Sequence, residues 1–139
     1  MAGLERFIDA QKGVWETAFS ELEDGRKQTH WMWFIFPQLA GLGRSHRATY
    51  YGIHNLDEAR DYLAHPVLSA RLEAATRAGL KHGTLSADAI MGPVDAMKLR
   101  SCATLFLAAG GGPAFQNVLD TFFAGQPCAA TQQLLDKKP

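Results

Sequence analysis

The chain has 139 residues, 47% of them hydrophobic and 20% charged, and its 14 basic side chains are balanced by 14 acidic ones. This length fits one domain, 1–139, which can bury a core without metals or disulfides. Zero net charge argues against nucleic acid and anionic membranes as partners. No apolar run reaches the roughly 20 residues of a membrane span, and no signal-peptide pattern opens the chain. We therefore expect a cytoplasmic protein.

Helix signals dominate the first third of the chain. Apolar residues recur at three- and four-residue steps over residues 4–22, which predicts one continuous amphipathic helix ended by Gly25. The aromatic run 31–36 fits either a second helix, capped by Thr29, or a buried strand. We favour the helix because no partner strand is visible in the sequence.

Capping residues and helix breakers divide the rest of the chain. Asn55, followed three residues later by Glu58, predicts the start of a short helix, and Pro66 suits the first position of the next one. Ser86 is expected to cap a brief turn. Longer helices are predicted over residues 94–109 and 114–124, with a short one over 131–137.

The absence of hairpin signals completes the fold prediction. We expect an all-α, compact single-domain array of about seven or eight helices, several of them short. In the helix over residues 94–109, the side chains expected to face the core are Met97, Leu99, Cys102, Leu105 and Phe106. Cys102 therefore reads as a buried structural thiol, while a disulfide with Cys128 stays open and a reducing compartment is favoured.

In the segment after Gly25, basic residues are followed directly by aromatic ones. Trp31 and Trp33, two positions apart, cannot both face one helical stripe, so at least one is expected on a cleft wall, where it could stack a planar ring. Core packing is the alternative. Arg26 and Lys27 would suit a phosphate or carboxylate, or they form a solvated surface run. His30 is a candidate for proton transfer or, alternatively, a helix cap.

A polar ridge is predicted on the helix over residues 94–109. Asp95, Lys98, Ser101 and Thr104 follow one another at three-residue steps and so share one face. This face could be a cleft wall on which Lys98 binds an anion while Asp95 holds the lysine or moves a proton. It could equally be a boundary with an ion pair and with hydroxyls bonded to the preceding turn. Gln38 could donate amide hydrogen bonds to the edge of a base.

Motifs for other chemistry are absent. The sequence has no phosphate loop followed by Lys and Ser or Thr, no His-Glu-x-x-His and no Cys-x-x-Cys. Gly41-Leu42-Gly43 lacks the third glycine of a dinucleotide-binding fingerprint. The histidines do not pair at a spacing typical of a metal site. We predict neither a metal nor a cofactor.

Several segments together resemble a known family. They are HWMWFIFPQ at residues 30–38, GLG at 41–43 and HPVL at 65–68, with Asp95, Lys98, Ser101 and Thr104 in the later helix. This pattern resembles the bacterial domain-of-unknown-function family 1810. The resemblance implies a small single-domain all-α fold and brings no established activity. Cys128 stands where the family usually has an acidic residue.

The resemblance also brings a label and an analogy. Some family members are labelled calpastatin, but such calpain inhibitors are disordered, whereas this chain is patterned to fold. The family is faintly similar, in its helical pattern and its aromatic and cationic content, to helical domains linked to NAD and ADP-ribose metabolism. That similarity is an analogy and does not identify a site.

Two functional hypotheses follow. In the first, the protein binds or acts on a phosphorylated, ring-containing ligand of the nucleotide, ADP-ribose or N-glycoside type. If it is an enzyme, it is then an N-glycoside or nucleotide-type hydrolase. This hypothesis requires His30 and Lys98 to line the same cavity. In the second, the exposed part of the aromatic segment is a protein-interaction or homodimer surface.

Overall fold

The computed structural model describes residues 3–137, and within this range the chain forms ten helices and no strand, which confirms the all-α prediction. Seven of these helices have seven or more residues. The four terminal residues of the predicted domain 1–139 lie outside the described residues. The helices are α1 (Glu5–Gln11), α2 (Trp15–Glu23), α3 (Met32–Ile35), α4 (His46–Tyr50), α5 (Leu56–Ala64), α6 (Pro66–Leu80), α7 (Ala87–Met91), α8 (Pro93–Ala108), α9 (Pro113–Phe122) and α10 (Ala129–Lys137).

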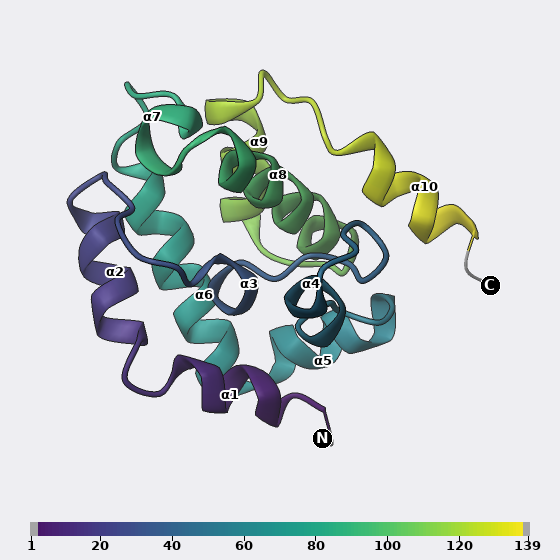
Figure 1. Ribbon diagram of the computed structural model, residues 1–139. Coiled ribbons are helices and arrows are strands. Elements are labelled where there is room, and N and C mark those ends of the chain that lie inside the picture. Colours follow the sequence, from purple (N-terminus) through teal and green to yellow (C-terminus); the bar gives the residue numbers. More distant parts are fainter. Residues whose placement is uncertain (1–2, 138–139) are drawn as a thin grey trace.

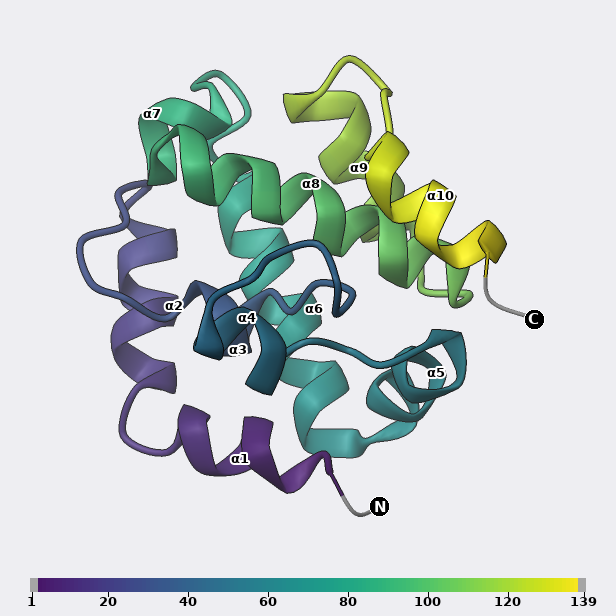
Figure 2. The ribbon, with the colours of Figure 1, turned by 45° about the vertical axis from the view of Figure 1, so that its right-hand side comes forward.

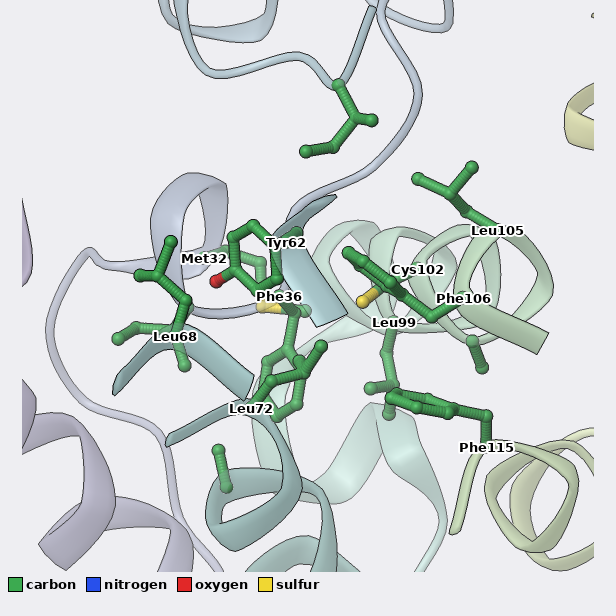
Figure 3. Close-up of a cluster of buried hydrophobic side chains, with 14 of the residues drawn as sticks. Met32, Phe36, Tyr62, Leu68, Leu72, Leu99, Cys102, Leu105, Phe106 and Phe115 are labelled. Carbon is green, nitrogen blue, oxygen red and sulfur yellow. The ribbon is translucent and has the colours of Figure 1, made fainter. Parts of the chain in front are cut away.

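Helix α8 is the centre of the arrangement and packs against α5, α7, α9 and α10 (Figure 1). Helix α6 lies beside α2 and α9, and α10 runs along the outer side of α8, as the rotated view shows (Figure 2). Large side chains from α5, α6, α8 and α9 meet in one buried cluster (Figure 3). In it, the rings of Tyr62 and Phe106 lie 5.2 Å apart. One core thus holds the helices together.

The cap signals placed most helix starts correctly. The Asn55 side chain accepts a hydrogen bond from the Glu58 backbone N–H at 2.9 Å, and Ser86 caps α7 in the same way. Pro66 is the first residue of α6. Ser45 caps α4, a short helix that the apolar periodicity did not reveal. These caps satisfy N–H groups that the first helical turn leaves without a partner.

The helix predicted over residues 4–22 is interrupted. Gly13, with a φ of 73°, separates α1 from α2. The side chain of Gln11 is buried, and its amide donates to the Phe34 carbonyl oxygen at 2.8 Å. Thr29 does not cap α3, because its hydroxyl donates to Glu21 instead. A continuous apolar pattern therefore hid a turn that glycine and a buried amide make possible.

Met97 faces outward, and its predicted place in the core is wrong. It is 71% exposed, and Val94, one turn earlier, is 66% exposed. At 3.6 residues per turn, Met97 lies more than half a turn from Leu99, which is buried. Because α8 is apolar on most of its surface, periodicity alone could not identify which side faces the core.

Removing the cap of α5 is expected to cost about 1 kcal/mol of folding free energy. Asn55→Ala leaves the Glu58 N–H without its side-chain acceptor. Urea denaturation of Asn55→Ala measures this loss. Asn55→Asp keeps an acceptor in the same place and serves as the control; an equal loss in both variants would show that the cap does not account for the effect.

Candidate functional site

A buried carboxylate holds the segment that connects α2 to α3. The side chain of Glu21 accepts hydrogen bonds from the backbone N–H groups of Gln28 and Thr29, at 2.7 and 3.0 Å. It also accepts from the Thr29 hydroxyl at 2.7 Å and from the Trp31 indole N–H at 2.9 Å. Burial alone would raise the pKa of this carboxyl group, but these hydrogen bonds outweigh it and lower the pKa to about 2. Glu21 thereby fixes the conformation of the residues next to Lys27.

Lys27 and Lys98 share one carboxylate. Lys27 Nζ lies 2.9 Å from Asp95 Oδ2, and Lys98 Nζ lies 3.3 Å from Asp95 Oδ1. The Lys27 side chain is only 7% exposed, and those of Asp95 and Lys98 are each 18% exposed. Lys98 Nζ also lies 3.7 Å from the centre of the Trp33 ring, a cation–π contact that fixes the ammonium group.

These groups line a small cavity between the α2–α3 connection, α4 and α8. Its volume is about 80 Å³, and Arg47 and His30 line it together with Lys27, Trp33, Asp95 and Lys98. Three permanent cations therefore face a single carboxylate. Among residues 3–137, no carboxylate forms an ion pair with Arg47. The cavity carries uncompensated positive charge, the property that attracts a phosphate or carboxylate.

A second hollow adjoins this cavity and has a different character. Its volume is about 270 Å³, and it shares Trp33 and Lys98 with the cationic cavity. Its other lining residues are mostly apolar. They are Leu42, Gly43, Val94, Met97 and Ala130, together with the more polar Gln38, Ser101 and Cys128. We call it the apolar groove. A cationic end and an apolar end thus meet at Trp33 and Lys98.

The two cysteines have opposite surroundings, and neither forms a disulfide. Cys102 is buried in the core, as predicted, and burial raises the pKa of its thiol. Cys128 is half-buried in the apolar groove. Burial would raise the pKa of its thiol too, but hydrogen bonds from Ser101, Thr131 and Ala130 together lower it.

The structure brings most of the predicted site residues together. Lys27, His30, Trp33, Asp95 and Lys98 all line the cationic cavity, so the requirement that His30 and Lys98 face one cavity is met. Gln38 and Ser101 line the apolar groove.

Three predicted ligand-binding residues do not have the position or the exposure that the prediction requires. Trp31 borders the cationic cavity but is completely buried, so its ring has no face free for stacking, and the core-packing alternative holds for it. Arg26 is exposed and does not line the cavity. Thr104 is buried; its hydroxyl donates to the Arg100 carbonyl oxygen at 2.8 Å and accepts from the Cys128 N–H at 2.8 Å. Thr104 therefore acts within the fold, as the boundary alternative described.

Two site residues were missed by sequence reasoning. Arg47 lies on α4, a helix whose only sequence signal was the cap at Ser45. Cys128 precedes α10, and only the tertiary contact between α10 and α8 places it beside Ser101. The positions of both residues depend on tertiary packing, which leaves no periodic pattern in the sequence.

These features define a small all-α protein with a cationic cavity joined to an apolar groove. The family model of DUF1810, which describes proteins of unknown function, matches residues 1–135 of the sequence. The chain therefore belongs to this family, as its sequence motifs predicted. It is similar to the crystal structure of the conserved hypothetical protein Rv1873 from Mycobacterium tuberculosis, with 41% identity and a TM-score of 0.94 over 97% of each chain. No curated protein matches the chain.

Two further observations bear on the class of site. In the part of the chain that the structure describes, no helix combines the length and the apolar character needed to cross a membrane. Over the same residues, His, Cys, Asp and Glu side chains nowhere gather in groups of three or more that could hold a metal ion.

Proposed function

We propose that this protein binds a small phosphorylated ligand that contains a ring, with the phosphate in the cationic cavity and the ring in the apolar groove. One observation carries the proposal: Lys27 and Lys98 share the single carboxylate of Asp95, while Arg47 lines the same cavity. The cations outnumber the carboxylate, so the cavity has charge left for an anion.

The cationic end is built to hold a single anionic group. Its volume of about 80 Å³ suits one phosphate or carboxylate and not a ring system. Asp95 keeps both lysine ammonium groups in place before a ligand arrives, which reduces the entropy lost on binding. Lys98 is held further by the face of Trp33. The guanidinium of Arg47 adds two-point recognition of phosphate oxygens.

The apolar groove supplies a surface for the ring. Trp33 and Lys98 line both hollows, so a ligand that extends from the phosphate reaches the groove directly. Leu42, Val94 and Met97 provide apolar contact there. Gln38 contributes an amide that can donate to or accept from a base edge. Such a mixture, mostly apolar with a few polar groups, is typical of small-molecule sites.

If the site also hydrolyses an N-glycoside or nucleotide, His30 is the residue placed to move a proton. Both oxygens of Asp95 are paired with lysine ammonium groups, so Asp95 enters the proposal as a positioning residue. His30 is exposed and lines the cavity, and its imidazole has one nitrogen that can accept a proton and another that can donate one.

Isothermal titration with AMP, inorganic phosphate and adenosine tests the proposal. AMP carries both parts of the proposed ligand, whereas phosphate and adenosine carry one each. We expect AMP to bind most tightly and phosphate to bind more tightly than adenosine. Equal affinity for AMP and adenosine would exclude the cationic cavity as the binding site.

Neutralising Lys98 in the cationic cavity is expected to weaken AMP binding by about tenfold, the effect of losing one charge-assisted contact. Lys98→Met keeps the length of the side chain and removes its charge. Lys81→Met is the matched control, because Lys81 pairs with Glu23 on the surface and lines neither hollow. Equal weakening in both variants would indicate nonspecific attraction and contradict the proposed site.

A protein-interaction surface is the second candidate function. The observation behind it is the exposure of Val94 and Met97, which lie one turn apart on α8. The aromatic segment itself is less suited, since Trp31 and Phe36 are buried. Sedimentation velocity over a wide range of concentration tests this alternative, with Met97→Lys as the variant expected to abolish any self-association.

A further inference from the structure

We propose that Cys128 is a nucleophilic thiol that undergoes exchange with small disulfides carrying a negatively charged group. Three features of the groove support this reactivity: hydroxyl and N–H donors around the sulfur, access from the groove, and the neighbouring cationic cavity. Cys102, the other cysteine, is buried in the core and serves as an internal comparison.

The hydroxyl of Ser101 can stabilise a thiolate at Cys128. Ser101 Oγ lies 3.1 Å from the Met97 carbonyl oxygen and 3.4 Å from Cys128 Sγ. A hydroxyl has one proton, so it donates to only one of these acceptors at a time. Because a thiolate is a far stronger acceptor than a thiol, ionisation of Cys128 draws this hydrogen bond to the sulfur.

The start of α10 contributes further donors. The Thr131 backbone N–H donates to Cys128 Sγ at 3.4 Å, as a helix N-cap interaction. The Thr131 side chain is fully buried, and its hydroxyl has no hydrogen-bond partner within residues 3–137. A hydrogen bond from this hydroxyl to the ionised sulfur is one of the causes that lower the pKa of Cys128. The positive end of the helix dipole acts in the same direction. An unpartnered buried hydroxyl beside the sulfur gains an acceptor when Cys128 ionises.

The backbone of Cys128 is fixed as well. Its N–H donates to the Thr104 hydroxyl at 2.8 Å, and Thr104 in turn donates to the Arg100 carbonyl oxygen on α8. The sulfur therefore has a defined position relative to Lys98, which lines the same groove. Pre-positioning of this kind favours attack on a bound electrophile over random encounter.

The neighbouring charges select the kind of disulfide, a step that rests on the proposed function of the cationic cavity. A disulfide with a carboxylate or phosphate can place that group beside Lys98 while its sulfur reaches Cys128. In the exchange, the Cys128 thiolate attacks one sulfur of the disulfide and a new S–S bond forms. The original S–S bond breaks, and the departing thiolate takes the electron pair. The proton lost by Cys128 goes to solvent.

Two aromatic disulfides test the proposal: DTNB (dithiobis-nitrobenzoate), which is anionic, and dipyridyl disulfide, which is neutral. We expect DTNB to modify one thiol per folded protein molecule, that of Cys128. The rate of this reaction, measured as a function of pH, should have its midpoint below the ordinary thiol pKa of about 8.5. Cys128→Ser should abolish the reaction and Cys102→Ser should preserve it. Reaction only after unfolding, or a midpoint above that value, would overturn the proposal.

Matched variants separate the reactive thiol from its charge preference. Ser101→Ala is expected to slow the reaction of Cys128 with both disulfides by a similar factor, because it removes a hydrogen-bond donor to the thiolate. Lys98→Met and Arg47→Gln should reduce the DTNB rate relative to the neutral disulfide by about threefold or more. An unchanged ratio in both would overturn the anionic preference. Phosphate binding by Cys128→Ser, measured separately, tests the cationic cavity without the thiol, so the two proposals fail independently.

Discussion

Glu21→Ala is expected to destabilise the protein by about 3 kcal/mol or more. The substitution removes the acceptor of four hydrogen bonds and leaves the buried indole N–H of Trp31 without a partner. It also frees the segment that positions Lys27, so AMP binding should weaken together with stability. Urea denaturation measures the first effect and isothermal titration the second.

Glu21→Gln separates the charge of this side chain from its shape. The amide oxygen can replace Oε1, which accepts the three N–H groups, and the amide nitrogen can donate to the Thr29 hydroxyl in place of Oε2. Neutral hydrogen bonds are roughly half as strong as charge-assisted ones, so we expect a loss of about 1 to 1.5 kcal/mol at neutral pH. Glu16→Gln, exposed on the same helix, should change stability by less than about 0.5 kcal/mol.

The pH dependence of stability identifies the same carboxylate. The pKa of Glu21 is about 2 in the folded protein, against an ordinary value of 4.5. A lowered folded-state pKa stabilises the fold above the unfolded value, and this contribution is lost as the pH falls from 4.5 towards 2. The difference in stability between the wild type and Glu21→Gln should therefore shrink over that interval. A constant difference would show that the Glu21 charge does not stabilise the fold.

Local signals in the sequence were sufficient for most of the helices. Asn55, Pro66 and Ser86 act through groups within their own first turn, so the chain around them contains the whole interaction. Gly13 was missed because the apolar residues on both sides of it continue one pattern, although the backbone turns there. The break depends on the long-range bond between Gln11 and Phe34, which periodicity cannot report.

The candidate site was predictable only in part, because several of its contacts join residues that lie far apart in the sequence. Asp95 and Lys98 lie one turn apart, so their ion pair follows from helical spacing. Lys27 pairs with Asp95 because Glu21 fixes the α2–α3 connection that carries this lysine. The same carboxylate accepts a hydrogen bond from the indole N–H of Trp31, which is buried in the core. Glu21 looks in the sequence like any acidic residue of a surface helix. The buried carboxylate of Glu21 thus holds Trp31 in the core, and Trp33 is the tryptophan whose ring is partly exposed at the cavity.

Gly52→Ala is expected to destabilise the protein by about 2 to 3 kcal/mol through overpacking. A Cβ at this position would lie 2.6 Å from Ala40 Cβ, 2.7 Å from Ala40 Cα and 2.8 Å from the Ala48 carbonyl oxygen. Two of these atoms belong to the backbone, so no side-chain rotation relieves the clash. The surrounding chain must move instead, including α4 and the parallel bridge between Leu39 and Ile53.

This displacement would also reach the cationic cavity, because Arg47 lies on α4. We therefore expect Gly52→Ala to weaken AMP binding even where the protein remains folded. Gly79→Ala is the matched control: Gly79 lies within α6, and a Cβ there would meet no atom within 4 Å apart from its chain neighbours and the adjacent backbone of its own helix. Since alanine favours a helix interior over glycine, the control should gain about 0.5 to 1 kcal/mol and bind AMP as the wild type does. If both variants lost stability equally, the close approach at Gly52 would not explain the effect; if Gly52→Ala alone lost stability but bound AMP normally, α4 would not position the cavity.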